Sequence, residues 1–268
     1  MSLSLTRTRF RNQPRVEKKI ETLNPLETMY INQENGFNEI IKNAELNNKI
    51  VFLEQYHFNK GTVIIAPDYY LVHNINGNVE KNIINTSGYV FKLKENISFN
   101  PNAVINIKTA SSDDVWKSND PISQQFSYYD PAAYGIGFFA AIALSATNVV
   151  LDLNNFTLEQ NISHYVNMRF YANIEIGDRP FIPKQGPHNF GPSITSANNC
   201  CIMNGHLGRS SHHGIHGNNA NNILLKNLSF TNYEIATIHL NGSTNISLKE
   251  ISGLRSCDSC PILGIFSA

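Results

Sequence analysis

A histidine-rich segment holds the residues of this sequence that are best suited to chemistry near neutral pH. It contains His212, His213 and His216, and a fourth histidine, His239, follows further along the chain. Imidazole is the side chain whose ordinary pKa lies closest to pH 7, so these histidines are candidate general bases. Arg209 supplies a cation in the same segment, and a cation is needed to neutralise the carboxylate of an acidic substrate.

The chemistry of these histidines depends on the secondary structure that carries them. On a β-strand, His212 and His216 face the same side but lie about 13 Å apart, which is too far for a shared metal ion. Too few other zinc ligands can be located near these histidines from the sequence, so we predict no metal and no cofactor. His216 and His239 should instead stack about 5 Å apart on neighbouring strands, where one of the two pKa values falls. A purely structural ladder of hydrogen-bonded histidines is the alternative interpretation.

The spacing of the histidines follows a repeat in the second half of the chain. Four stretches share a corner asparagine followed by alternating apolar residues, at Asn148, Asn199, Asn222 and Asn245. The last three are evenly spaced, His216 and His239 share that spacing, and such a period with short strands is typical of coils stacked on one another. Stacking places Leu225 over Leu248 at about 4.8 Å, and asparagine suits the corner because it tolerates left-handed backbone. We therefore predict an all-β fold, a parallel β-helix with coils of about 23 residues.

Two segments are expected from the distribution of charged and apolar residues. Residues 1–33 form a basic arm that lacks the apolar run of a secretory signal, so we expect a protein made in the cytosol. Residues 34–268 form the β-helix domain. A short amphipathic helix at residues 36–49 is expected to cap its first coil, which would otherwise expose an unpaired edge. Residues 108–136 indicate a long loop.

The repeat is interrupted once. Asn148 and Asn199 are separated by one period plus a further, longer stretch, so an excursion is inserted near residues 159–186. Long loops of this kind commonly carry function, and we predict that this one forms a wall of a site. The candidate substrate-binding residues are Arg169, Tyr171 and Lys184 of the excursion together with His212. The alternative interpretation is a lid that covers an apolar strip of the coil.

Composition excludes several classes of protein. The chain has 268 residues, of which 41% are hydrophobic and 16% are charged, and its formal net charge is zero. It can build one sizeable core, and its composition indicates neither a disordered chain nor a membrane span. The balanced charge gives no basis for binding nucleic acid, so we expect no nucleic-acid partner.

The four cysteines are expected to be packing residues. Cys200 and Cys201 are adjacent, so on a strand they point to opposite faces and cannot easily act together. Cys257 and Cys260 form a Cys-x-x-Cys pair. Neither a helix nor a second such pair accompanies them, as a redox or zinc motif would require.

Three features together resemble a known fold family. They are the helix followed by strands, the coil at Asn221–Phe230 and the run His212–Gly217. Over residues 35–268 the chain is similar to the pectin-lyase-like superfamily, which implies a right-handed parallel β-helix. Members of that superfamily cleave, epimerise or bind polysaccharides, and many viral and phage members are surface or tail components. The abundance of Asn, Ile and Lys is also typical of AT-rich genomes, such as those of large DNA viruses of protists.

Each activity found in this superfamily requires particular catalytic residues, and the sequence can be searched for them. Hydrolases of the polygalacturonase type use several aspartates on neighbouring coils, and the two aspartates after residue 153 lie far apart in the sequence. Glu175 with Asp178 is too small a cluster to hold calcium. Elimination or epimerisation of an acidic sugar needs a base and a neutralising cation. The candidates are, for the base, His216 or His239 and, for the cation, Arg209 or Lys184.

Two functions from different classes follow from these observations. The first is a non-catalytic structural or glycan-binding module of a larger, virion-associated assembly. The alternative is a polysaccharide lyase or epimerase that acts on an acidic polysaccharide, with His216, His239 and Arg209 as catalytic residues. Residues 260–268 begin a further coil that stops where the next corner asparagine would stand. We therefore expect this end to be open and to be covered by other protein chains, in an oligomer or an assembly.

Overall fold

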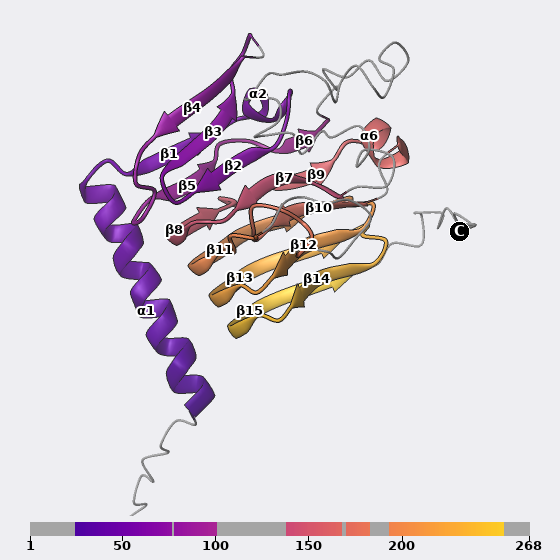
Figure 1. Ribbon diagram of the computed structural model, residues 1–268. Coiled ribbons are helices and arrows are strands. Elements are labelled where there is room, and N and C mark those ends of the chain that lie inside the picture. The colour runs from indigo at the N-terminus through magenta and orange to yellow at the C-terminus, as the bar shows by residue number, and fades with distance from the viewer. Residues whose placement is uncertain (1–24, 77, 101–137, 168–169, 183–192, 255–268) are drawn as a thin grey trace, which may run out of the picture.

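The protein is built mainly of β-strands arranged in two sheets (Figure 1). The computed structural model describes residues 25–76, 78–100, 138–167, 170–182 and 193–254. The predicted loop at 108–136 and most of the predicted arm at 1–33 lie outside these ranges.

The first sheet has eight strands, and all of its pairs are parallel. Its main path runs through β1 (Ile50–Leu53), β5 (Val90–Leu93), β8 (Thr147–Asp152), β11 (Asn198–Leu207), β13 (Asn221–Thr231) and β15 (Thr244–Leu254). Two short strands extend it, namely β9 (Thr157–Gln160), which pairs with β11, and β6 (Ile97–Phe99), which pairs with β9.

The second sheet has seven strands and carries the histidines. Its order is β14 (Ala236–Asn241), β12 (His213–Asn218), β10 (Phe170–Glu175), β7 (Phe138–Leu144), β2 (Val63–Ala66), β3 (Tyr69–His73) and β4 (Val79–Ile83). The strands from β14 to β2 pair in parallel, whereas β3 and β4 add an antiparallel extension. From β7 onward the chain alternates between the two sheets, except that β8 and β9 follow each other in the first sheet.

The strand register confirms the period of the repeat. Leu225 on β13 pairs with Leu248 on β15, and His216 on β12 pairs with His239 on β14. The two sheets enclose one apolar core, in which Ile215, Ile223 and Leu225 are fully buried. Leu248 occupies the same position as Leu225 one repeat later, but it is 55% exposed because β15 is the last strand of its sheet among the described residues.

The corner asparagines are also confirmed. Asn148, Asn199, Asn222 and Asn245 have φ values of 57°, 50°, 56° and 54°, which is left-handed backbone. The amide of Asn199 donates to Asn148, and the amide of Asn222 donates to Asn199, so the side chains form a ladder along the stack. A second set of left-handed corners at Asn204, Asn227 and Glu250 has the same spacing, because each repeat must bend more than once.

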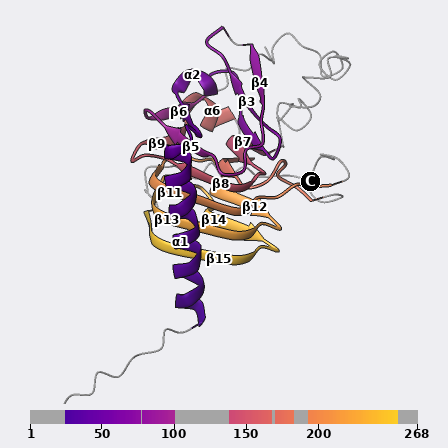
Figure 2. The same cartoon turned by 90° about the vertical axis from the view of Figure 1, so that its left-hand side faces the viewer.

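The N-terminal helix differs from the prediction in both length and place. Helix α1 covers Pro25–Leu46 rather than 36–49, so it includes part of the predicted arm. It does not cap the end of the stack, but lies across the outer face of the first sheet and crosses β11, β13 and β15 (Figure 2). Its buried Phe37 and Ala44 cover apolar side chains that point outward from four strands, namely Val90, Val150, Cys201 and Leu224. None of the described helices combines the length and apolar character that crossing a membrane would require.

The predicted excursion at 159–186 is not a single inserted loop. Residues 170–175 form β10, an ordinary strand between β7 and β12, and Ile162–Asn167 form the short helix α6. The strand is hard to recognise because it hides two polar side chains, Asn173 and Glu175, both fully buried. Asn173 donates from its side-chain amide to the carbonyl of Gly208 at 3.1 Å.

The adjacent cysteines point to opposite faces, as predicted. Cys200 lies in the core between the sheets, and Cys201 lies under α1. Both are free thiols, and burial raises the pKa of Cys200 to about 12. The two buried thiols are therefore unreactive near neutral pH, and their role is to pack against neighbouring side chains. Cys257 and Cys260 lie outside the described residues.

Candidate functional site

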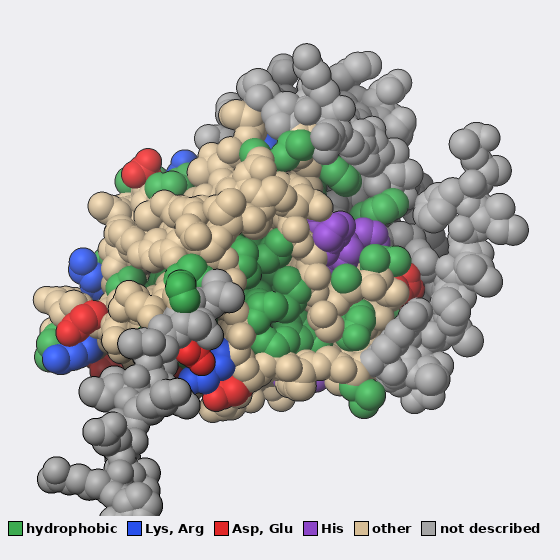
Figure 3. All heavy atoms as spheres, turned by 90° about the horizontal axis from the view of Figure 1, so that it is seen from below, with side chains coloured by type: hydrophobic (Ala, Val, Ile, Leu, Met, Phe, Trp, Pro, Cys, Tyr) green, Lys and Arg blue, Asp and Glu red, His purple; other side chains and the backbone are tan. Residues whose placement is uncertain are grey.

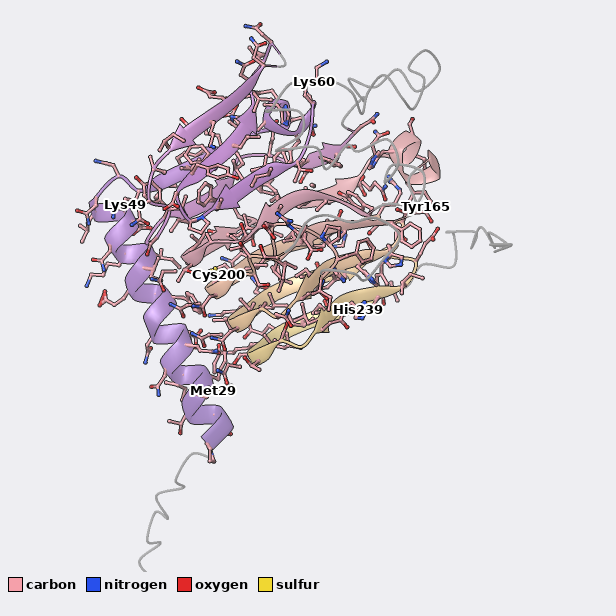
Figure 4. All side chains as sticks on the ribbon, viewed as in Figure 1. Met29, Lys49, Lys60, Tyr165, Cys200 and His239 are labelled. Atoms are coloured by element: carbon pink, nitrogen blue, oxygen red, sulfur yellow. The ribbon has the colours of Figure 1, made fainter. Side chains whose placement is uncertain are left out.

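Three histidines gather on the outer face of the second sheet. His213 and His216 lie on β12, and His239 lies on β14 directly beside His216 in the strand register. The rings of His216 and His239 are 5.4 Å apart, as the stacking predicts, and they meet edge to face. Figure 4 shows His239 on its strand, and Figure 3 shows histidine side chains grouped beside apolar ones.

Alternation along the strand predicts that His212 shares the outer face with His216, whereas in the structure the ring of His213 lies 5.3 Å from that of His216. A Cβ atom on Gly214 would come within 2.6 Å of the buried ring of Phe230, so this position faces the interior. Ile215 is also buried in the core. Two consecutive residues therefore face inward, and the break in alternation puts His213 and His216 on the same outer face. No pattern of apolar residues signals this break in advance.

His216 is held by the buried carboxylate of Glu175. The sequence pattern suggested no role for Glu175 beyond a calcium cluster that was too small. Glu175 of β10 lies beside His216 in the register, and its Oε2 is 2.6 Å from His216 Nδ1. Burial raises the pKa of Glu175, and the neighbouring imidazole partly offsets this effect. The other carboxylate oxygen, Oε1, has no hydrogen-bond partner among the described residues. The hydrogen bond fixes the orientation of the His216 ring.

His213 is the most deeply buried member of the group. Its Nε2 lies 3.1 Å from His239 Nδ1, so one ring donates and the other accepts. Burial and the three neighbouring imidazoles lower the pKa of His213 to about 2, and it is therefore neutral at physiological pH. His212 precedes β12, and its ring centroid lies 3.9 Å from that of His213.

The histidines line a cleft of about 300 Å³. His216 faces outward as predicted, but its side chain is only 9% exposed, because neighbouring elements cover the strand face. The other residues of the cleft wall are Phe170, Pro180, Phe181, Ile182, Asn218 and Asn241. The described wall therefore consists of imidazoles, two amides and apolar side chains, without a Lys, Arg, Asp or Glu.

Of the remaining predicted site residues, the two that the structure describes, Arg209 and Tyr171, are not among the residues that line this cleft. Arg209 is held elsewhere, because its guanidinium donates to the carbonyl of Gln160 at 3.1 Å and pairs with Glu159 at 3.4 Å. Tyr171 is fully buried in the core and packs on Phe99, which places its side chain in the interior of the protein. Arg169 and Lys184 lie outside the described residues.

Comparison with known proteins does not indicate a function, so the function has to be inferred from the geometry of the cleft. No protein-family model matches the chain, and neither the curated proteins nor the solved structures include one that is significantly similar to it. No family is shown. The resemblance drawn from the repeats and the histidine run therefore stays a hypothesis about the fold.

Proposed function

We propose that the chain is a right-handed parallel β-helix module that binds a neutral glycan in the histidine cleft without processing it. Two features support the β-helix: the parallel pairs along each sheet, and the alternation of the chain between the sheets once in every repeat. Right-handedness is the expected sense, because crossover connections between parallel strands of one sheet are right-handed in about 98% of cases.

The composition of the cleft wall is the observation that carries the binding function. Phe170 and Phe181 offer ring faces on which the apolar side of a sugar can pack. Asn218 and Asn241 offer amides that can both donate to and accept from sugar hydroxyls. A concave, largely apolar site with a few convergent polar groups is the usual form of a small-ligand site.

Without a bound metal ion, the charge of the described side chains of the cleft favours a neutral ligand over an acidic one. A uronate polymer brings a carboxylate that must be neutralised, and the described wall offers no cation for it. Arg209, the cation predicted for this role, is engaged by Glu159. His213 contributes no charge either, since burial keeps it neutral.

Calorimetry with neutral hexasaccharides of glucose, mannose, galactose and N-acetylglucosamine tests this function. We expect at least one of them to bind, and Phe181→Ala to weaken that binding about tenfold through loss of the ring contact. Phe52→Ala is the matched control, because Phe52 is 45% exposed on β1 of the other sheet. If none of the sugars binds, or if the two variants weaken binding equally, the cleft is not the glycan site.

A lyase or epimerase is a second candidate function, and the pair of Glu175 with His216 is what favours it. A histidine oriented by a buried carboxylate has the arrangement of a general base, which could remove the carbon-bound proton of a uronate. Incubation with polygalacturonate and alginate should then give an unsaturated or epimerised product that is lost in His216→Ala. If neither polymer is altered, only the binding function stands.

We also propose that the module associates through the end of the stack formed by β14 and β15, with a second copy of the chain as its partner. These are the last strands of their sheets among the described residues. Apolar side chains are exposed there, and Figure 3, which looks onto this end, shows them as a continuous patch. The ribbon of α1 also extends past β15 (Figure 1). An open edge with apolar surface is a template for strand addition.

Light scattering across a range of protein concentrations should therefore detect a dimer or larger species. Leu254→Asp should shift the protein toward monomer, since Leu254 is 69% exposed at this end. Ile83→Asp is the control, because Ile83 is 70% exposed on β4 at the other end of the second sheet. A monomer at every concentration, or equal effects of the two substitutions, would contradict association through β15.

A further inference from the structure

Ring nitrogens of three histidines converge in the cleft. One ligand atom from each of His213, His216 and His239 lies within 4.8 Å of the other two. His213 Nε2 and His239 Nδ1 are 3.1 Å apart. Nitrogen ligands of a tetrahedral zinc ion lie about 2.0–2.1 Å from the metal, which places them roughly 3.3 Å from each other. These two nitrogens therefore already have the separation that a shared ion requires, and the exposed His239 has room to adjust to the third.

Glu175 completes the arrangement from behind His216. Its hydrogen bond to Nδ1 leaves Nε2 of His216 as the nitrogen that can bind a metal. Histidine ligands of metal sites almost always donate their other ring nitrogen in this way, to a carboxylate, a carbonyl or water. The bond is 2.6 Å long, and Glu175 is fully buried.

The buried carboxylate also needs a positive charge near it. A carboxylate removed from water is costly unless it is compensated, and neither lysine nor arginine is among the described residues that line this cleft. A divalent cation on the far side of the His216 ring supplies the compensation.

The type of ligand atom determines which metal ions suit the site. Imidazole nitrogens suit zinc, copper, iron and nickel, whereas magnesium and calcium prefer oxygen ligands. Three histidines with a fourth position left open is a ligand set found in catalytic zinc sites, and structural zinc sites instead use four protein ligands. The open volume of the cleft, about 300 Å³, leaves space for a solvent or solute molecule at the fourth position.

We propose that His213, His216 and His239 bind one Zn²⁺ ion, positioned by Glu175, with its fourth coordination position open to the cleft. This site goes beyond glycan binding and does not depend on it, because the ion is bound by the protein alone. It also departs from the sequence-based expectation of no metal. That expectation rested on the distance between His212 and His216 and on the lack of further ligands, whereas in the structure His213 and His239 lie close to His216.

Titration of ZnCl₂ into the metal-stripped full-length chain tests the site directly. Calorimetry should give one equivalent bound, and the melting temperature should rise, because an ion that binds only the folded state stabilises it. His239→Ala removes an exposed ligand, so the variant should fold and lose at least about 100-fold in affinity. Glu175→Gln removes only the positioning charge, and we expect a loss of about 10–100-fold.

Two controls separate this site from other donors in the chain. His206→Ala changes a histidine that bonds Ser229 and Thr231 away from the cluster, and it should keep the wild-type affinity. A Cys257→Ser, Cys260→Ser double variant should also keep it, and the Co²⁺-loaded protein should show a four-coordinate visible spectrum without a sulfur-to-cobalt band. The proposal is overturned if the wild-type chain binds no zinc, if His239→Ala binds it as tightly, or if the cysteine variant abolishes binding.

Discussion

Replacing Leu225 with aspartate should leave the chain largely unfolded or insoluble. Leu225 is fully buried between the two sheets, so the substitution removes core packing and places a carboxylate where it has no partner. Loss of a buried leucine costs about 2–5 kcal/mol, and burial of an unpaired polar group adds roughly 2 kcal/mol or more. The sum approaches the whole stability of an ordinary domain, about 5–15 kcal/mol. Soluble yield and urea denaturation followed by circular dichroism measure the effect.

Leu248→Asp is the matched control for this substitution. Leu248 is the same residue type at the same position of the repeat, since it pairs with Leu225 across β13 and β15. It is 55% exposed, so its carboxylate stays in contact with water and the cost should be below about 1 kcal/mol. Equal stability of the two variants would show that Leu225 is not inside the stack.

Most of the regular part of the fold could be predicted from the sequence, because stacking imposes a strict condition on it. Every repeat must place an apolar residue over the one before, and every corner that needs left-handed backbone favours asparagine. The period at Asn199, Asn222 and Asn245 is therefore visible in one sequence. Glu250 shows where the rule weakens, because it has left-handed backbone at φ 55° without being asparagine or glycine.

The irregular features could not be predicted, for reasons that are physical. The position of α1 depends on apolar side chains that face outward, such as Cys201 and Leu224, and alternation alone does not reveal what covers them. Strand β10 was obscured by buried polar residues that only tertiary contacts make acceptable.

Only part of the candidate site could be predicted, because contacts between distant segments also decide which residues belong to it. The pairing of His216 with His239 follows from the period. His213 joins them only because Gly214 and Ile215 both face inward, and Glu175 only because β10 lies next to β12. Register between strands that are far apart in sequence decides which polar groups meet, and a single sequence does not encode that register in a readable pattern.

Mild acid should destabilise the protein strongly, because several histidines are buried without charge. Burial, together with the charge of Lys60, lowers the pKa of His73 to about 4, and burial lowers that of His164 to about 4. An unfolded histidine has a pKa of about 6.5. Below that value the unfolded chain takes up protons that the folded chain does not, so stability is complete above pH 6.5 and falls as the pH drops toward 4.

The size of the effect follows from the two pKa values. At pH 5 each of these histidines should cost roughly 2 kcal/mol of stability relative to pH 7.5. Burial also lowers the pKa of His57 and His206, which adds loss in the same direction. Glu175 acts in the opposite sense, because its raised pKa makes the folded state take up a proton first. Four histidines with a lowered pKa act against this one carboxyl, so we expect the net change in acid to be destabilising.

Thermal melts of the metal-stripped chain at pH 7.5 and pH 5 should therefore differ by about 10 °C, with the lower melting temperature in acid. His73→Gln and His164→Gln each remove one group that takes up a proton on unfolding, so each should reduce the pH dependence even where it lowers stability at pH 7.5. Equal melting temperatures at the two pH values would mean that His73 and His164 take up protons in the folded state, and hence that they are not enclosed as the structure places them.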